Sequence, residues 1–283
     1  MTKLKGILLT QGMHGMISQV EGLAKALDLD FTHHTVELNS FWKLFPPKLT
    51  PVSQKVFKKI NVEDYDVIIS CGRKSVIPSI YLKKISSKKI TNIHIQDPKV
   101  NLDNFNYIIA PEHDGLHGKN VFSTKGAIHY LTKKEIENNT DYLKNKLNDN
   151  KEYFLLILGG PTKHYDYSNE NISNILSLFN NLVEKNNLQG IIVPSTRTPK
   201  NIIELSKNKS GRTSLVIEDV DKKAYLSSLS LAKYIAVTCD STSMISEAAL
   251  TGKPIYVAEI PTKKNDSRIQ KFIELFTKLN IIK

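Results

Sequence analysis

A chain of 283 residues, 40% hydrophobic and 24% charged, is long enough for two domains of ordinary size, each with its own core. No apolar run reaches the ~18–20 residues of a membrane-spanning helix. The two cysteines, Cys71 and Cys239, lie far apart and have no metal-ligand spacing. A transmembrane protein, a disulfide framework and a structural zinc site are therefore not expected, and we expect a cytoplasmic protein.

The formal net charge is +11, which attracts phosphate-bearing partners. The lysines are spread along the chain, without an arginine-rich block or a basic stripe studded with aromatic residues. We therefore expect no dedicated nucleic-acid binding. A phosphorylated ligand, or peripheral contact with an anionic surface on the inner face of the membrane, fits the charge better. The alternative is a charge that reflects only a lysine-rich composition.

The first half of the chain alternates short apolar runs with helix-like segments. The run "KGILLT" at its start is interpreted as a strand and not as a signal peptide. Strands are predicted at residues 5–10, 31–38, 65–70, 89–96, 107–111 and 121–126, and helices at 16–27 and 75–86.

The same pattern restarts at residue 153, after a polar, asparagine-rich segment that we interpret as the linker (131–152). Strands are predicted at 153–160, 190–196, 213–219, 234–238 and 254–260. Helices are predicted between them at 170–187, 199–208, 222–232 and 243–252, and a last amphipathic helix follows at 266–283.

Strand–helix alternation of this kind predicts the α/β class, with parallel sheets and crossover helices. Two such series predict two Rossmann-like domains whose sheets face a central cleft. We place the N-terminal domain at 1–145 and the C-terminal domain at 146–262. Residues 263–283 form a helix that is expected to return to the first domain and pack across both.

Ligands of open α/β sheets bind beyond the carboxyl ends of the strands, so the residues that follow each strand are candidates. In the first half, "TQGMHG" contains His14, and "CGRKS" places Arg73 and Lys74 at a helix start, where they favour an anion. "PEHD" contains His113 and Asp114, which lack the HExxH arrangement of a zinc site and fit a cleft lining better. An ordinary glycine turn and a solvated helix start remain the alternatives.

Three turns of the second half also carry polar residues. "LGGPTKHY" offers Gly159, Gly160 and Thr162, and "STRTP" offers Arg197. In "TCDSTSMISEA", Asp240 or Ser241 can cap a helix that continues through Ser243 to Glu247. Hydroxyls at a helix start suit a phosphate, and an acid one turn further on suits a pair of ribose hydroxyls. An ordinary capping box is the alternative.

Several motifs resemble one known family along nearly the whole chain. "VIISCGRKS", "IHIQDP", "APEHD", "LGGPTKHY", "STRTP" and "TCDSTSMISEAALTGKP" occur in this order. They are similar to the family of the plant mitochondrial fission factor and its bacterial homologues. That family in turn resembles GT-B glycosyltransferases, which have two Rossmann-like domains around a cleft.

The resemblance implies a nucleotide-diphosphate sugar as ligand of the C-terminal domain. Gly159, Gly160, Thr162, Ser241 and Ser243 would then face the diphosphate, and Glu247 would hold the ribose. Arg197 and Lys163 would neutralise the leaving diphosphate, without a metal or another cofactor. In the first domain, Arg73 and Lys74 would line the acceptor side, and His14, His113 or Asp114 would be the general base.

Two functions follow from this resemblance. The first is a metal-independent glycosyltransferase. The second is a non-catalytic adaptor that keeps the scaffold, as the plant member does when it recruits a dynamin-like GTPase. An epimerase with a tyrosine–lysine dyad and a GxGxxG turn is not expected, because neither motif is visible in the sequence.

Overall fold

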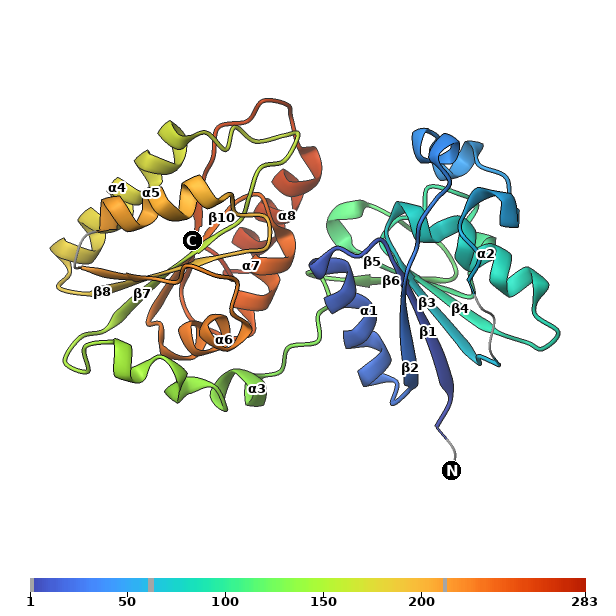
Figure 1. Cartoon of the computed structure of the whole chain (residues 1–283), viewed down its shortest axis with the longest axis horizontal. Helices are drawn as coiled ribbons and strands as arrows, with labels where there is room; N and C mark the ends of the chain where they lie inside the picture. The colour runs from blue at the N-terminus through green and yellow to red at the C-terminus, as the bar shows by residue number, and fades with distance from the viewer. Residues whose placement is uncertain (1–2, 61–63, 211–212) are drawn as a thin grey trace. The chain divides into compact units, whose positions relative to one another are not determined.

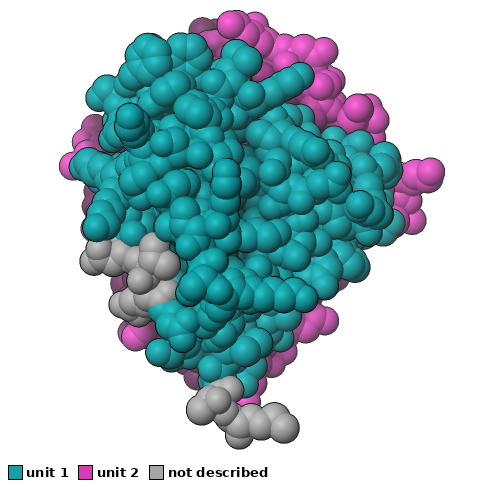
Figure 2. All heavy atoms as spheres, turned by 90° about the vertical axis from the view of Figure 1, so that its right-hand side faces the viewer, with its two compact units in different colours: residues 1–130 teal, residues 131–283 magenta. Residues whose placement is uncertain are grey.

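The structure, a computed structural model, describes residues 3–60, 64–210 and 213–283 of the chain. The chain divides into two compact units, Met1–Tyr130 (unit 1) and Leu131–Lys283 (unit 2), which Figure 2 colours separately. Among the described residues, no helix is both long and apolar enough to cross a membrane.

Unit 1 is built on a parallel sheet with the strand order β2-β1-β3-β4-β5-β6 (Figure 1). The strands are β1 (Lys5–Thr10), β2 (Asp30–Thr35), β3 (Val67–Cys71), β4 (Thr91–Ile95), β5 (Tyr107–Pro111) and β6 (Val121–Thr124). Its helices are α1 (His14–Ala26) and α2 (Val76–Ile85), and short 3-10 turns lie at 40–44, 47–49, 54–56, 73–75, 102–104 and 112–114.

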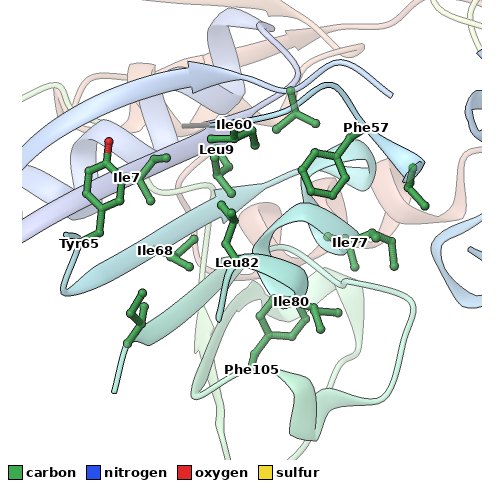
Figure 3. Close-up of a cluster of buried hydrophobic side chains, with 14 of the residues drawn as sticks. Ile7, Leu9, Phe57, Ile60, Tyr65, Ile68, Ile77, Ile80, Leu82 and Phe105 are labelled. Carbon is green, nitrogen blue, oxygen red and sulfur yellow. The ribbon is translucent and has the colours of Figure 1, made fainter. Parts of the chain in front are cut away.

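Each face of this sheet has its own core, because alternate residues of a strand point to opposite sides. Ile7 and Leu9 of β1 join the cluster beneath α2, which also holds Phe57 and Phe105 (Figure 3). Leu8 lies between them in sequence and joins the cluster on the α1 side. Apolar residues on both faces explain why the strands read as continuous apolar runs.

Unit 2 has a second parallel sheet with the order β11-β10-β7-β8-β9. The strands are β7 (Tyr153–Leu158), β8 (Gln189–Pro194), β9 (Ser214–Val216), β10 (Tyr234–Thr238) and β11 (Ile255–Ala258). The helices are α3 (Lys133–Glu137), α4 (Asn169–Lys185), α5 (Lys200–Ser210), α6 (Lys222–Leu231), α7 (Thr242–Ala249) and α8 (Ser267–Lys278). The α/β class and the two parallel sheets are therefore as predicted.

The segment predicted as a linker is hydrogen-bonded onto α6. Leu143 N–H donates to Ser227 Oγ at 3.2 Å, and that hydroxyl donates to the Thr140 carbonyl at 2.9 Å. Tyr142 donates its hydroxyl proton to Asp221 at 2.7 Å. These bonds explain why the units divide after Tyr130, whereas the sequence placed the boundary at residue 145.

The C-terminal helix α8 packs within unit 2. Ile269 belongs to the hydrophobic cluster of the α4 face, while Phe272 and Phe276 are buried. After the helix, Ile282 pairs in parallel with Ile255, so the chain ends beside β11. The return of this segment to the first domain stays a prediction.

Ser227 gives a test of how residues 131–145 attach to unit 2. We expect Ser227→Ala to lower the free energy of unfolding of unit 2 by about 1–3 kcal/mol, because it leaves a buried N–H and a partly buried carbonyl without their partner. Denaturant unfolding followed with hydrogen exchange at Leu143 measures this loss. Ser177→Ala is the matched control, since the Ser177 hydroxyl is exposed and bonds only within its own helix. Equal stability of the two variants would contradict the attachment.

Candidate functional site

Three of the predicted turns meet at one edge of the unit 2 sheet. Strands β10, β7 and β8 are neighbours, so the turns after them, at 239–241, 159–160 and 195–198, lie side by side. Backbone and side-chain hydrogen bonds join them: Gly159 N–H donates to Thr238 Oγ1 at 2.8 Å, and Thr198 Oγ1 lies 2.6 Å from the Gly159 carbonyl oxygen. The edge is therefore one connected polar structure.

Asp240 is at the centre of this network. Its side chain is fully buried, and Oδ1 accepts the Thr238 hydroxyl proton at 2.7 Å. Oδ2 accepts the Gly160 N–H at 3.1 Å and pairs with Arg197 Nη2 at 2.7 Å. Arg197 also donates through Nη1 to the Gly160 carbonyl at 3.1 Å. A buried carboxylate is stable only with such partners, so the three turns depend on one another.

This packing explains the two glycines differently from the sequence. A Cβ at Gly159 would lie 2.2 Å from Asp240 Oδ2, and a Cβ at Gly160 would lie 2.1 Å from the Arg197 carbonyl oxygen. Side chains are thus excluded by the protein's own Asp240 and Arg197. Both glycine N–H groups are also already bonded, to Thr238 and Asp240, whereas the sequence expected them to face a diphosphate.

Helix α7 begins directly after this edge. Ser241 is its N-cap and accepts the Met244 N–H at 3.4 Å, so Ser241 and not Asp240 caps the helix. Ser243 lies in the first turn and is half-buried. Glu247 lies one turn further on, is buried, and accepts the Tyr225 hydroxyl proton at 2.9 Å. The phenol of α6 thereby holds a carboxylate close behind the start of α7.

The remaining predicted groups of this unit lie in the turn after β7. Thr162 accepts the His164 N–H at 3.1 Å, and Lys163 between them is exposed. Cys239 is buried, and burial raises the pKa of its thiol to about 11. A thiol of this kind is a weak nucleophile at neutral pH.

In unit 1, the predicted anion-binding turn follows β3. Gly72 has φ of 88°, and a Cβ there would meet the Met16 sulfur at 2.6 Å, so glycine is required. Arg73 donates through Nη2 to the Lys43 carbonyl at 2.7 Å. Its guanidinium therefore fastens the loop that contains Lys43. Lys74 follows in the same turn and is half-buried.

The three candidate bases lie on two separate strand ends. His14 is the first residue of α1 and is exposed, with its ring edge-on to Tyr130 at 6.4 Å. His113 and Asp114 follow β5; the His113 side chain is fully buried, 3.8 Å from Asp114 Oδ1. Strands β3 and β4 separate β1 from β5, which corresponds to about 14 Å. His14 and His113 therefore do not form a pair. No group of three or more metal-capable side chains occurs in the ranges that the structure describes.

Sequence reasoning missed two residues of the unit 2 edge. Thr238 was not among the predicted site residues, although its hydroxyl stands only two residues before Asp240, to which it donates a hydrogen bond. Tyr225 gave no signal, because its partner Glu247 lies 22 residues away in the sequence.

Two Rossmann-like units with parallel sheets define a GT-B-like fold, the class of scaffold found in several nucleotide-sugar enzymes. Residues 14–283 match the family described as mitochondrial fission ELM1, so the chain belongs to this family. The resemblance inferred from the motifs and the fold class inferred from the strand–helix alternation are both confirmed.

Two curated relatives show how far the likeness extends. The uncharacterized protein RP120 of Rickettsia prowazekii is 28% identical, over 92% of this chain and 84% of its own length. The mitochondrial fission protein ELM1 of Arabidopsis thaliana is 23% identical over 68% of this chain. The match covers 51% of the plant protein, about half of its length.

Solved structures of other proteins share the fold. UDP-GlcNAc 2-epimerase of Neisseria meningitidis, solved bound to UDP-GlcNAc, matches with a TM-score of 0.55 at 15% identity, over 98% of this chain and 91% of that one. MurG of Acinetobacter baumannii matches with a TM-score of 0.55 at 10% identity, over 100% and 85%. At these identities the likeness concerns the fold alone.

The Asp240 network predicts a large loss of stability on truncation. We expect Asp240→Ala to lower the free energy of unfolding of unit 2 by about 3–5 kcal/mol, because the buried Gly160 N–H and the Arg197 guanidinium lose their common partner. Urea denaturation measures the difference. Glu218→Ala, which removes an exposed pair with Lys207, is the control and is expected to cost about 0–1 kcal/mol. A loss as small at Asp240 as at Glu218 would show that the network is not needed.

The buried thiols predict slow alkylation of the folded protein. Iodoacetamide reacts with the thiolate, and a pKa raised to about 11 leaves only about a thousandth of Cys239 ionised near pH 8. Cys71 is buried as well. Mass spectrometry is expected to find both cysteines unmodified in the native protein and both modified in denaturant. Rapid native labelling of Cys239 would contradict its placement.

Proposed function

We propose that the protein binds a nucleotide-diphosphate sugar in unit 2 and acts as a GT-B-like glycosyltransferase. The observation that carries the proposal is Glu247, a buried carboxylate held by Tyr225 one turn behind the start of α7. The fold adds support, since the epimerase of N. meningitidis with the same architecture was solved bound to UDP-GlcNAc.

The diphosphate is assigned to the mouth of the three joined turns. Arg197 is suited to it, because its side chain is 30% exposed while Asp240 fixes its direction. Ser243 and the hydroxyl-rich start of α7 add donors and the positive end of a helix dipole. The glycine N–H groups are already bonded, so Gly159 and Gly160 contribute shape more than hydrogen bonds. Lys163 and Thr162, in the turn after β7, are also assigned to the diphosphate.

Glu247 is assigned to the ribose hydroxyls. A carboxylate accepts hydrogen bonds through two oxygens, so Tyr225 at Oε2 is compatible with a ligand hydroxyl at the same group. Bonds of hydroxyls to a charged acceptor are stronger than neutral ones. The tyrosine also orients the carboxylate before the ligand arrives, which reduces the entropy lost on binding.

The transfer step needs a base and a stabilised leaving group. In the proposed reaction, a hydroxyl oxygen of the acceptor bonds to the anomeric carbon of the sugar while the bond from that carbon to the diphosphate breaks. The hydroxyl proton passes to the base, and Arg197 and Lys163 offset the charge of the departing diphosphate. His14 is the preferred base, since it is exposed while His113 is fully buried. Arg73, Lys74 and Asp114 remain assigned to the acceptor side in unit 1.

A non-catalytic adaptor is the second candidate. It is favoured by membership of the mitochondrial fission ELM1 family and by the burial of His113. An adaptor keeps the scaffold and binds a nucleotide sugar weakly or not at all. An epimerase is a third and weaker candidate. UDP-GlcNAc 2-epimerases share this fold, so the absence of the tyrosine–lysine dyad from the sequence does not exclude that class.

Calorimetry with UDP- and GDP-sugars tests the proposal. We expect one of them to bind, and Glu247→Gln to weaken it about tenfold or more, because the charged acceptor for the ribose is lost. Tyr225→Phe keeps the carboxylate but removes its support, so a smaller loss is expected. Glu184→Gln, at an exposed glutamate of α4, is the control and is expected to bind as the unaltered protein does.

The two main candidates differ in turnover. A transferase releases nucleoside diphosphate slowly even without acceptor, by hydrolysis of the donor, and His14→Ala is expected to reduce the release. Binding without any release would favour the adaptor. If no nucleotide sugar binds the unaltered protein, the donor site is wrong.

A further inference from the structure

The connection between β2 and β3 exposes an unusual set of apolar side chains. It forms the blue 3-10 turns at the top of unit 1 in Figure 1. Phe41 is 61% exposed, Leu44 80% and Leu49 65%, and Val52 is also exposed. These four residues lie within twelve positions of the sequence. Exposed apolar groups that gather in this way mark an interaction surface.

The segment that carries these exposed side chains is anchored to the rest of unit 1. Leu38 and Phe57 pair across its base, and the Asn39 N–H donates to the Val56 carbonyl at 2.9 Å. Val56 and Phe57 are buried in the cluster beneath α2, as Figure 3 shows for Phe57. Arg73 fastens the tip through the Lys43 carbonyl. The turns are therefore held in place with their apolar side chains directed outward.

An aromatic group stiffens the tip itself. The rings of Phe41 and Trp42 lie 4.9 Å apart, and Phe45 lies 4.9 Å from Phe41 and 5.7 Å from Trp42. Trp42 packs partly against the core, which leaves Phe41 as the outermost ring. Leu44 and Leu49 are further exposed apolar side chains of the same segment.

The charges around the tip have one sign. Residues 38–60 contain five lysines and no acidic residue. All five are exposed: Lys43, Lys48, Lys55, Lys58 and Lys59. The one nearby acid with a described contact, Glu37, is paired with Lys58, which holds the pKa of that carboxyl below its usual value. Although the lysines of the whole chain are spread along the sequence, this segment combines its five lysines with Phe41, Trp42 and Phe45.

We propose that residues 38–60, here termed the lysine–aromatic tip, dock unit 1 on an anionic lipid bilayer. Phe41, Leu44 and Leu49 enter the boundary between headgroups and acyl chains, and the lysines lie among the lipid phosphates. Aromatic and leucine side chains beside lysines are the composition of interfacial membrane anchors.

A protein partner fits this surface less well than a bilayer. The cores of protein interfaces are depleted in lysine, yet here lysines alternate with the apolar residues. An extended anionic surface contacts exposed lysines such as Lys43 and Lys48 without requiring matched acids at fixed positions. The proposal is independent of the donor site, because it involves only unit 1 residues and needs no nucleotide sugar.

Vesicle co-sedimentation tests the docking. The full chain is expected to bind vesicles of phosphatidylcholine mixed with phosphatidylglycerol, and to bind pure phosphatidylcholine much more weakly. Each lysine near an anionic surface contributes about fivefold to partitioning, so the Lys43→Ala/Lys48→Ala variant is expected to bind roughly 25-fold more weakly. High salt is expected to reduce binding as well.

The apolar part needs its own variant. Phe41→Ser/Leu44→Ser/Leu49→Ser is expected to reduce binding about tenfold or more at unchanged charge. Leu178→Ser/Leu182→Ser, which alters exposed leucines of α4 in unit 2, is the matched control and is expected to leave binding unchanged. A melting curve of each variant establishes that it is folded.

Trp42 reports the contact directly, since it is the only tryptophan of the chain. Its emission is expected to shift to the blue with anionic vesicles and to stay constant with neutral ones. Equal binding to both vesicle types, full binding by the serine variant, or no binding at all would overturn the proposal. If the protein bound neither vesicle type, an acidic protein would replace the bilayer as the partner of the tip.

Discussion

The buried carboxylate of Asp240 is the contact on which the unit 2 edge depends. Three strands end side by side, and three groups at these ends bind the carboxylate: Gly160 in the turn after β7, Arg197 in the turn after β8 and Thr238 at the end of β10. Removing any partner would leave charge or hydrogen-bonding capacity unsatisfied in a buried place. The glycines follow from this arrangement, because any side chain at Gly159 would occupy the space of the carboxylate.

This constraint also determines what the edge offers to a ligand. The two glycine amides bond to Thr238 and Asp240, so the proposed donor site relies on the guanidinium of Arg197 and the start of α7 for its anion contacts. An arginine held on one side by a carboxylate is pre-organised, since fewer of its rotamers are lost on binding. Tyr225 does the same for Glu247. The proposed donor site thus consists of two charged groups of opposite sign, each fixed by a neighbour.

Much of the fold could be predicted from the sequence, because continuous apolar runs and amphipathic helices reveal buried parallel strands and their crossovers. The division of the chain into two units after Tyr130 could not be predicted in this way. Residues 131–145 are polar and have the composition of a linker, and their bonds to Asp221 and Ser227 join positions about eighty apart.

The sequence indicated the candidate site as three separate turns. It did not reveal the hydrogen bonds and the ion pair that join these turns through Asp240. The sequence also gave no indication that the Arg73 guanidinium fastens a loop thirty residues away. The lysine–aromatic tip was overlooked because its apolar residues gave no information about exposure.

The central claim is that the turns after β7, β8 and β10, with the start of α7, form the ligand-binding edge of unit 2. Hydrogen exchange with and without UDP-GlcNAc, at a concentration that calorimetry shows to be saturating, tests it most directly. The account predicts slower exchange at residues 195–198 and 241–247 and little change at the distant end of α4. Protection confined to other segments, or none at all, would contradict it.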